Sequence, residues 1–148
     1  MKCTKKQRLS YTEKARQIVD KMTLEEKVDL MSGNFTLEEM MTETLEAMKS
    51  GDISKHYNHI PYPAGGNKKY GIAPMLFCDG PRGVVCGTGS STCFPVSMLR
   101  GAAFDTELEE EIGHAIGREV RAYGGNLFAG VCINLPYNPG WGRSQETY

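Results

Sequence analysis

The chain has 148 residues, of which 40% are hydrophobic, and its 17 basic and 18 acidic residues give a formal net charge of −1. This composition is typical of a globular protein and excludes a disordered or collagen-like chain, and the balanced charge gives no field that would attract nucleic acid or an acidic membrane surface. No apolar run approaches the roughly 18 residues of a membrane span, and the basic N-terminus has no apolar core like that of a signal peptide. We therefore expect no membrane partner and a cytoplasmic location.

The basic residues before Thr12 are interpreted as a solvated tail, and three helices are predicted after it. The sequence predicts them over residues 12–22, 24–31 and 37–48. Two of them begin with an S/T-x-x-E capping box, in which the Ser or Thr and the Glu each bond a backbone N–H at the start of the helix. The two capping boxes are Thr23 with Glu26 and Thr36 with Glu39.

The helix predicted over residues 37–48 has a Met-rich apolar stripe on one face. Such a stripe is far more often a packing surface than a cofactor site, so we interpret it as packing. Its members are Leu37, Met41, Leu45 and Met48. The next stretch, residues 50–69, is rich in Gly, Pro, Asn and Lys and predicts a long loop or insertion.

A strand, a helix and a second strand follow this loop. The apolar run "APMLFCDG" (73–80) predicts a buried strand, residues 105–123 predict an amphipathic helix, and "LFAGVCIN" (127–134) predicts a second strand. Asp105 can cap the helix, and Gly124 can end it. A strand, helix and strand with short joints form a βαβ unit, so the two strands are expected to be parallel in an α/β fold.

Several polar side chains fall at the carboxyl ends of these predicted strands, where ligands bind in folds of this kind. Asp79 follows the first strand and Asn134 ends the second, and the loop that holds Trp141 and Arg143 comes next. These residues are therefore expected to lie close together.

Each of these side chains has two interpretations. Asp79 can be a turn residue that bonds its own loop, or its carboxylate can accept hydrogen bonds from the vicinal hydroxyls of a sugar. Arg143 can form a salt bridge within its loop, or its guanidinium can bind hydroxyls. Trp141 can stack on a sugar ring or pack at the rim of the fold.

Cysteine and histidine spacing predicts neither a disulfide framework nor a metal site. The cysteines are odd in number and lack C-x-x-C spacing, so we interpret them as reduced thiols. The two histidines of the 50–69 stretch have no Cys or carboxylate partner at metal spacing, and the third lies inside the predicted long helix, where we interpret it as a surface residue. These residues are Cys3, Cys78, Cys86, Cys93, Cys132, His56, His59 and His114.

The Gly-rich loop "CGTGSST" (86–92) is the sole basis for a nucleotide-binding alternative. It fits neither G-x-G-x-x-G nor G-x-x-x-x-G-K-[ST], the two spacings that cradle phosphates. No cofactor is therefore expected.

Three stretches carry a resemblance to a known family: "KMTLEEKVDLMSG", "GIAPMLFCDGPRGV", and the run from "STCFPVSMLRGAAF" to Tyr148. Their order and spacing resemble the N-terminal part of glycoside hydrolase family 3, the β-glucosidases and β-xylosidases. The resemblance extends from about Lys21 to Tyr148, with 50–69 as an insertion. It implies that residues 1–148 are the first part of a (β/α)8 TIM-type barrel domain. It also implies an enzyme that releases terminal non-reducing β-D-glucosyl or xylosyl residues with retention.

The resemblance also implies roles for individual residues. Asp79 matches the family's Asp that holds hydroxyls of the innermost sugar, and Arg143 matches the Arg of G-R-x-x-E that contacts the same sugar. Glu146 takes the place of that motif's Glu. Arg82, Trp141 and Glu146 are expected to form the wall of the site. The family's nucleophilic Asp, its Lys-His pair and its acid/base Glu match no position in this chain, so no catalytic residue is expected in it.

One stretch departs from the family pattern. Where relatives often read N-x-x-R-D-P, this chain has Tyr137 in place of the Arg and Asn138 in place of the Asp. The resemblance implies that these positions support Arg143, so the changes affect the surroundings of that side chain. The sequence therefore does not decide between glucosides and xylosides as substrates.

The length of the chain leads to a further expectation. A complete barrel of this type takes roughly 200 to 250 residues, so 148 residues supply only part of one. We therefore expect the remainder of the enzyme, in the same or a separate chain, to complete the barrel, and we expect the 148 residues alone to be inactive on a β-glycoside or oligosaccharide. The alternative is a non-catalytic sugar-binding or scaffold half-barrel that oligomerises to cover its sheet edges.

Overall fold

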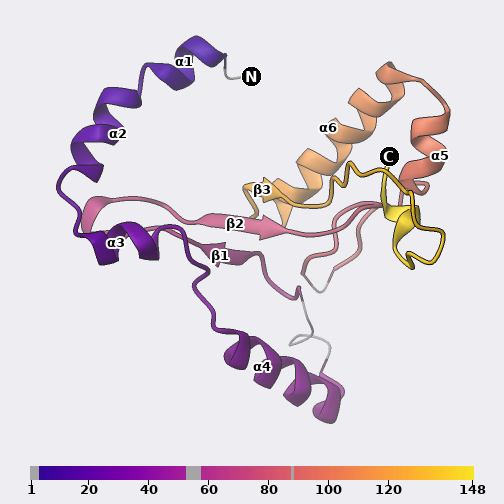
Figure 1. The fold of residues 1–148 in the computed structure, drawn as a ribbon. Helices are drawn as coiled ribbons and strands as arrows, with labels where there is room; N and C mark the ends of the chain where they lie inside the picture. Colours follow the sequence, from indigo (N-terminus) through magenta and orange to yellow (C-terminus); the bar gives the residue numbers. More distant parts are fainter. Residues whose placement is uncertain (1–3, 53–57, 88) are drawn as a thin grey trace.

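The computed structural model describes residues 4–52, 58–87 and 89–148 (Figure 1). The predicted thiol Cys3, His56, residues 53–57 of the predicted loop and Thr88 of the Gly-rich loop lie outside the described residues. The helices are α1 (Lys5–Leu9), α2 (Thr12–Val19), α3 (Leu24–Asp29), α4 (Leu37–Ser50), α5 (Ser97–Ala102) and α6 (Thr106–Ala122). Short 3-10 helices are η2 (Lys68–Tyr70) and η3 (Ser144–Glu146), and the strands are β1 (Tyr62–Ala64), β2 (Met75–Cys78) and β3 (Leu127–Phe128). None of the helices in these ranges is long and apolar enough to cross a membrane.

The three strands form one sheet in the order β1-β2-β3. β2 and β3 are parallel, with Phe77 opposite Leu127, and α5 and α6 connect them. This arrangement confirms the predicted strand, helix and strand and the α/β class.

Residues 50–69, for which the sequence predicts a long loop or insertion, contain the strand β1, so the loop prediction is wrong for residues 62–64. β1 pairs antiparallel with β2, with Tyr62 opposite Phe77. The ring of Tyr62 also meets Phe35 edge to face, with ring centroids 5.9 Å apart. Backbone pairing and this aromatic contact stabilise a strand whose composition is unfavourable, and Pro63 is tolerated because β1 lies at the sheet edge.

The second strand is shorter than predicted: the sequence predicts it over residues 127–134, and β3 ends at Phe128. The backbone N–H of Ala129 still donates to the Cys78 carbonyl at 2.8 Å, but Gly130 then lies so close to the Gly80 carbonyl that a Cβ would collide with it. Asn134 therefore does not lie at the end of the strand, as the sequence predicted.

Helix starts follow the predicted capping. Thr23 with Glu26 and Thr36 with Glu39 make both reciprocal hydrogen bonds, and Asp105 accepts from the Leu108 N–H at 2.9 Å. A third capping box, formed by Thr4 and Gln7, starts α1. Residues 5–9 form a short helix because the cap satisfies its first backbone N–H groups, and all of them are exposed, as predicted for a solvated segment.

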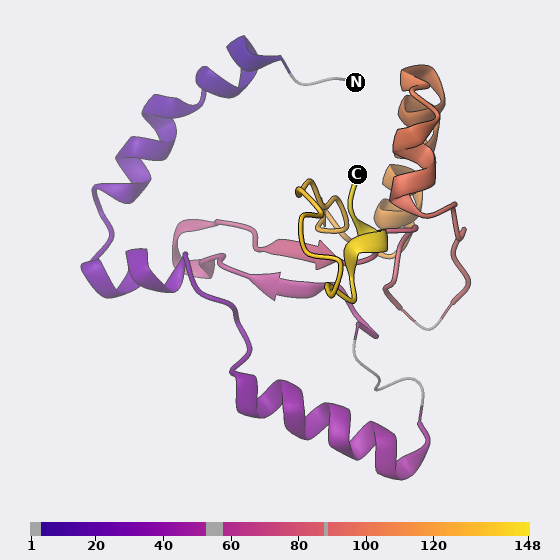
Figure 2. The ribbon, with the colours of Figure 1, turned by 45° about the vertical axis from the view of Figure 1, so that its right-hand side comes forward.

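The core lies between α6 and the sheet. Ile112, Ile116 and Val120 on one face of α6 are buried in one cluster with Cys78, Val84 and Cys86. Figures 1 and 2 show α6 on one side of the sheet and α4 on the other. This core holds the end of β2 and the following loop in place.

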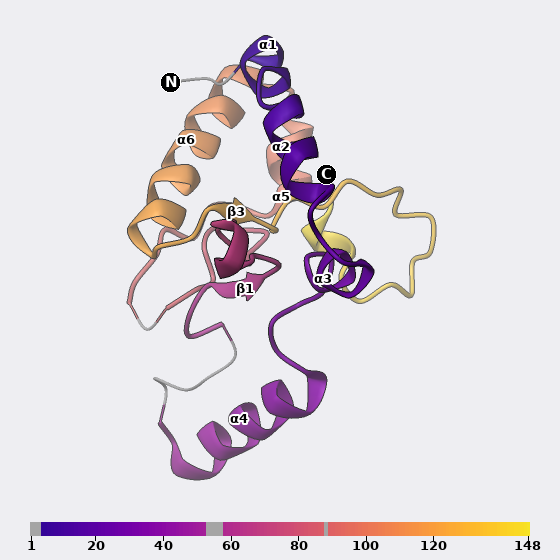
Figure 3. The same cartoon turned by 90° about the vertical axis from the view of Figure 1, so that its left-hand side faces the viewer.

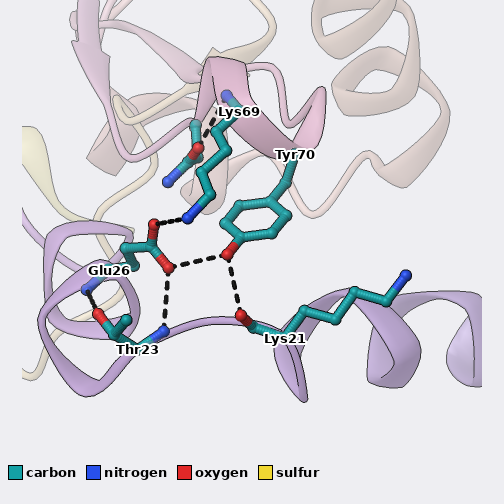
Figure 4. A network of polar contacts seen from close by, with 6 residues as sticks. Lys21, Thr23, Glu26, Lys69 and Tyr70 are labelled. Atoms are coloured by element: carbon teal, nitrogen blue, oxygen red, sulfur yellow. Dashed lines mark hydrogen bonds and ion pairs between the residues drawn. The ribbon is translucent and has the colours of Figure 1, made fainter.

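The N-terminal helices lie outside this core. The four apolar side chains of the α4 stripe are exposed, so the predicted packing is not present among the described residues. Figure 3 shows α4 apart from the sheet. α3 is tied to η2 instead through Glu26, which accepts from Lys69 Nζ at 2.8 Å and from the Tyr70 hydroxyl at 2.9 Å (Figure 4).

Candidate functional site

Asp79 is the first residue after β2, and hydrogen bonds from the loop that follows hold it in position. Its Oδ1 accepts from the Gly80 N–H at 2.8 Å, and its carbonyl accepts from the Val85 N–H at 2.7 Å. Gly80 has φ +124°, and a Cβ on it would collide with the Gly83 carbonyl oxygen. The D-G pair is therefore required by the backbone path, and it leaves Asp79 at the carboxyl end of the strand.

Arg143 lies just before η3 and is paired with Glu146. The guanidinium donates from Nε to Oε1 at 2.8 Å and from Nη2 to Oε2 at 2.5 Å. These hydrogen bonds lower the pKa of Glu146 and raise the pKa of Arg143, to which the charge of Asp79 also contributes. The Arg143 side chain is 73% exposed, so most of its donor surface faces solvent.

Asp79, Trp141, Arg143 and Glu146 line one cavity of about 250 Å³. These four are among the five site residues predicted from the sequence. The remaining wall comes from Pro81 and from the backbone run 129–132 that follows β3. The structure thus brings together two segments that are far apart in the sequence.

Arg82 lies elsewhere. Its Nε donates to the Phe94 carbonyl at 3.4 Å, and the Phe94 N–H donates to the Arg82 carbonyl at 2.7 Å. It is not among the residues that line the 250 Å³ cavity. These two hydrogen bonds join the segments that precede and follow the Gly-rich loop.

Sequence reasoning missed the contribution of Cys132. It lines the cavity and makes a parallel bridge with Thr147, so it joins the segment after β3 to the segment after η3. The Asn134 Nδ2 donates to Cys132 Sγ at 2.9 Å. No local signal marks Cys132, because its role depends on pairing with residues near the other end of the loop.

Asn134 and Trp141 line a neighbouring cavity of about 560 Å³. Trp141 is shared between this cavity and the smaller one. The structure therefore does not place Asn134 on the same wall as Asp79, and it places the indole of Trp141 between two spaces.

The Gly-rich loop is bonded within the fold. Gly87 and Gly89 lie against Tyr123: a Cβ on Gly87 would be within 3 Å of ring atoms, and a Cβ on Gly89 would be 2.9 Å from the hydroxyl oxygen. The Tyr123 hydroxyl donates to the Ser90 carbonyl at 2.7 Å, and the Thr92 hydroxyl donates to Glu119 at 2.5 Å. The glycines are thus explained by the packing of Tyr123.

The site combines one acceptor and one donor group around a small space. The carboxylate of Asp79 accepts hydrogen bonds, and the guanidinium of Arg143 donates them in a planar fork. Ligand cavities for drug-sized molecules usually hold about 300 to 1,000 Å³, so a space of about 250 Å³ fits one small polar ring. A larger cavity of about 720 Å³ lies beside α6, but its lining is mainly apolar and includes Ile116, Val120 and Val131.

The sequence is similar to part of several β-glucosidases. No family model matches the chain. A β-glucosidase of Rhizobium radiobacter is 29% identical over 136 residues, which are 88% of this chain and 14% of that protein. A probable β-glucosidase F of Aspergillus oryzae is 30% identical over 140 residues, which are 94% of this chain and 14% of that protein.

A solved structure is similar as well. β-Glucosidase 3B from Thermotoga neapolitana in complex with α-D-glucose matches with a TM-score of 0.69 and 27% identity. The match covers 91% of this chain and 19% of that one. The chain therefore spans only 14% to 19% of the length of these relatives, and its α/β fold matches the N-terminal part of the solved β-glucosidase.

Proposed function

We propose that the chain supplies the sugar-binding part of a β-glycosidase of family 3, and its similarity to part of several β-glucosidases supports this proposal. The observation that carries the proposal is that Asp79 and Arg143 line one small cavity. In the whole enzyme these two residues bind hydroxyls of the terminal non-reducing glucosyl residue. Hydrolysis of the β-glycosidic bond then proceeds with retention of configuration.

The two groups suit a sugar because they are complementary to neighbouring hydroxyls. The carboxylate oxygens of Asp79 accept two hydroxyl protons in charge-assisted hydrogen bonds, and the guanidinium of Arg143 donates to hydroxyl oxygens. Glu146 occupies one edge of that guanidinium, which leaves its remaining N–H groups for the ligand. Trp141, which lines the same cavity, offers an apolar ring face to the sugar.

The chemical step needs groups from other segments. Retaining hydrolysis uses two carboxyl groups about 5 to 5.5 Å apart, one as nucleophile and one as acid and base. The carboxylates of this cavity are Asp79 and Glu146. Glu146 is bonded through both oxygens to Arg143, and Asp79 is assigned to sugar hydroxyls. We therefore assign the nucleophile and the acid/base residue to the remainder of the enzyme.

We also propose that residues 1–148 are the first part of a (β/α)8 barrel domain, to which β2 and β3 contribute parallel strands. The parallel pair β2 and β3 with α6 between them supports this proposal. Asp79 lies at the carboxyl end of β2, where the ligands of such barrels bind. The non-catalytic half-barrel that oligomerises is not favoured, because the relatives are enzymes named β-glucosidase.

Two measurements on the 148-residue chain test this division of labour. The first is a titration with glucose followed by NMR, in which we expect saturable binding. The second is incubation with an aryl β-glucoside, in which we expect no release of the aryl group. Absence of glucose binding would contradict the sugar-binding role, and hydrolysis at enzyme-like rates would contradict the assignment of the catalytic carboxylates to other segments.

A further inference from the structure

Arg100, Glu109 and Tyr148 form a cluster that joins α5, α6 and the segment after η3. We propose that this cluster positions Arg143 for sugar binding, so that its three members act as positioning residues of the site. The inference rests on the proposed function, because it assigns these residues a role in the cavity of Asp79 and Arg143. None of the three is expected to touch the sugar in that cavity, since none lines it.

The first part of the cluster is an ion pair between two helices, in which Arg100 is buried and Glu109 is partly exposed. Arg100 Nε donates to Glu109 Oε1 at 2.7 Å, and Nη2 donates to Oε2 at 2.6 Å. The Arg100 side chain is only 6% exposed. A planar pair of this kind fixes both side chains in one orientation, and loss of either partner leaves a charge without its counterpart. The hydrogen bonds from Arg100 lower the pKa of Glu109, so its carboxylate is charged at neutral pH.

Tyr148 is bound to both members of this pair. Its hydroxyl donates to Glu109 Oε2 at 2.9 Å. Its ring lies beneath the Arg100 guanidinium, with 5.4 Å between Arg100 Cζ and the ring centroid. A hydroxyl donor and a cation above the ring hold the aromatic side chain from two directions. Tyr148 is therefore fixed to α5 and α6.

The backbone carries this restraint from Tyr148 to Arg143. The Tyr148 N–H donates to the Cys132 carbonyl at 3.2 Å, and Thr147 makes a parallel bridge with Cys132. Thr147 is completely buried, and its hydroxyl donates to the Ser144 carbonyl at 2.8 Å. Figures 1 and 2 show this segment as the yellow end of the chain, lying beside α5.

Arg143 depends on this segment for its orientation. The Glu146 N–H donates to the Arg143 carbonyl at 3.1 Å, and the Glu146 carboxylate binds the Arg143 guanidinium. The guanidinium is otherwise largely exposed. An exposed arginine loses considerable rotamer freedom when it binds a ligand, and a prearranged carboxylate reduces that cost. Movement of η3 would shift Glu146 and, with it, the donors of Arg143.

A double-mutant cycle on the 148-residue chain tests the proposal. Tyr148→Phe removes the hydroxyl and keeps the ring, and Arg143→Gln removes the sugar-binding donors; the double variant combines them. We expect Tyr148→Phe to raise the glucose Kd about three- to tenfold, because one hydrogen bond to a charged group is lost. In the Arg143→Gln background the same change is expected to have less than about a twofold effect.

The cycle separates positioning from general loosening of the fold. A merely structural role for Tyr148 would weaken glucose binding equally in both backgrounds, and this result would overturn the proposal. Arg100→Lys is the second variant, because it keeps the charge and loses the paired geometry; it should reproduce the effect of Tyr148→Phe. Tyr11→Phe is the matched control, since Tyr11 lies between α1 and α2, is 64% exposed and lines neither the 250 Å³ nor the 560 Å³ cavity; it should leave the Kd unchanged.

Amide hydrogen exchange tests the anchoring of residues 146–148 independently of glucose binding. Exchange at Glu146, Thr147 and Tyr148 should become about tenfold faster in Tyr148→Phe, because their N–H groups lie in the anchored segment. Unchanged exchange would overturn the anchoring itself. If exchange accelerates but the unsubstituted chain binds no glucose, the proposed function is wrong and the role of the cluster in sugar binding falls with it.

Discussion

Asp79 and Arg143, which are far apart in the sequence, line the same cavity of about 250 Å³. Asp79 is brought there by the end of β2, and Arg143 by the loop that leads to η3. The hydrogen bonds to Glu146 are the main cause of the raised pKa of Arg143, and the charge of Asp79 adds to it. An acceptor and a donor of opposite charge are thus presented to one small space, which is the arrangement that a sugar with neighbouring hydroxyls requires.

The Arg143 and Glu146 pair makes glucose binding sensitive to acid. The hydrogen bonds from Arg143 lower the pKa of Glu146 below its usual value of 4.5. A carboxyl group with a lowered pKa keeps its stabilising contact above the usual value and loses it as the pH falls through the lowered one. Glucose affinity should therefore be constant from pH 7 to about pH 5 and fall below about pH 4.5, as followed by NMR titration.

Glu146→Gln is the variant that isolates this effect. It should lower glucose affinity at pH 7 and leave a shallower dependence on pH than the unsubstituted chain shows, because one of the two carboxyl groups that line the cavity is gone. A steep acid loss of equal size in Glu146→Gln would show that another group controls binding.

The contacts of Glu26 should make the stability of the chain sensitive to acid. Its carboxylate accepts from Lys69, from the Thr23 N–H and from Tyr70 (Figure 4), and these contacts lower its pKa to about 2. Because this pKa is lowered, the contacts of Glu26 make their whole contribution to the free energy of unfolding above about pH 4.5. That contribution is lost as the pH falls toward about 2. Glu26→Gln should therefore lower the Tm at pH 7, and the difference from the unsubstituted chain should shrink in that acid range.

The matched control for Glu26 is Glu46→Gln, a change at an exposed position of α4. Its Tm should equal that of the unsubstituted chain at every pH. Equal Tm values for Glu26→Gln and Glu46→Gln at pH 7 would mean that the contacts between α3 and η2 add no stability.

The turn after Asp79 should not tolerate a side chain. Gly80→Ala places a Cβ at φ +124° against the Gly83 carbonyl, so the free energy of unfolding should fall by about 2 kcal/mol or more. Gly113→Ala is the control, because a Cβ on this helical glycine meets nothing within 4 Å; it should stabilise by about 0.5 to 1 kcal/mol. Urea denaturation measures both, and a neutral Gly80→Ala would contradict the described turn.

Two of the cysteines should resist alkylation in the native chain. Cys78 and Cys86 are buried in the core, and burial raises the pKa of both thiols, that of Cys86 to about 12. Since the thiolate is the reactive form, iodoacetamide at pH 8 should modify the exposed Cys93 much faster. Peptide mapping by mass spectrometry measures each site. Rapid native modification of Cys86 would contradict its burial, and denaturation should make the rates similar.

The parts of the structure that depend on local signals could be predicted from the sequence. The capping boxes of α3 and α4, the long helix α6 and the strand before Asp79 all have their causes within a few neighbouring residues. β1 could not be predicted, because its stability depends on pairing with β2. The same limit applies to β3, whose end is set by the close approach of Gly130 to Gly80.

The candidate site divides in the same way. The position of Asp79 followed from the end of a strand, and the closeness of Trp141, Arg143 and Glu146 followed from their shared loop. The part played by Cys132 and the anchoring of Tyr148 by Glu109 could not be predicted, because they are contacts between segments distant in the sequence. The hydrogen-bonding chemistry of these residues could be predicted from the sequence, but the residues that line the cavity could be identified only from the tertiary structure.

The most direct test of the central claim is the glucose Kd of Asp79→Asn and Arg143→Gln, measured by NMR titration of the 148-residue chain. Asp20→Asn and Arg16→Gln are the matched controls, since Arg16 forms an exposed i,i+3 pair with Glu13, as Arg143 does with Glu146. We predict that each site variant raises the Kd about tenfold or more, because a hydrogen bond to a charged group is lost, and that the controls leave it unchanged. An unchanged Kd in both site variants would contradict the claim that Asp79 and Arg143 hold the sugar.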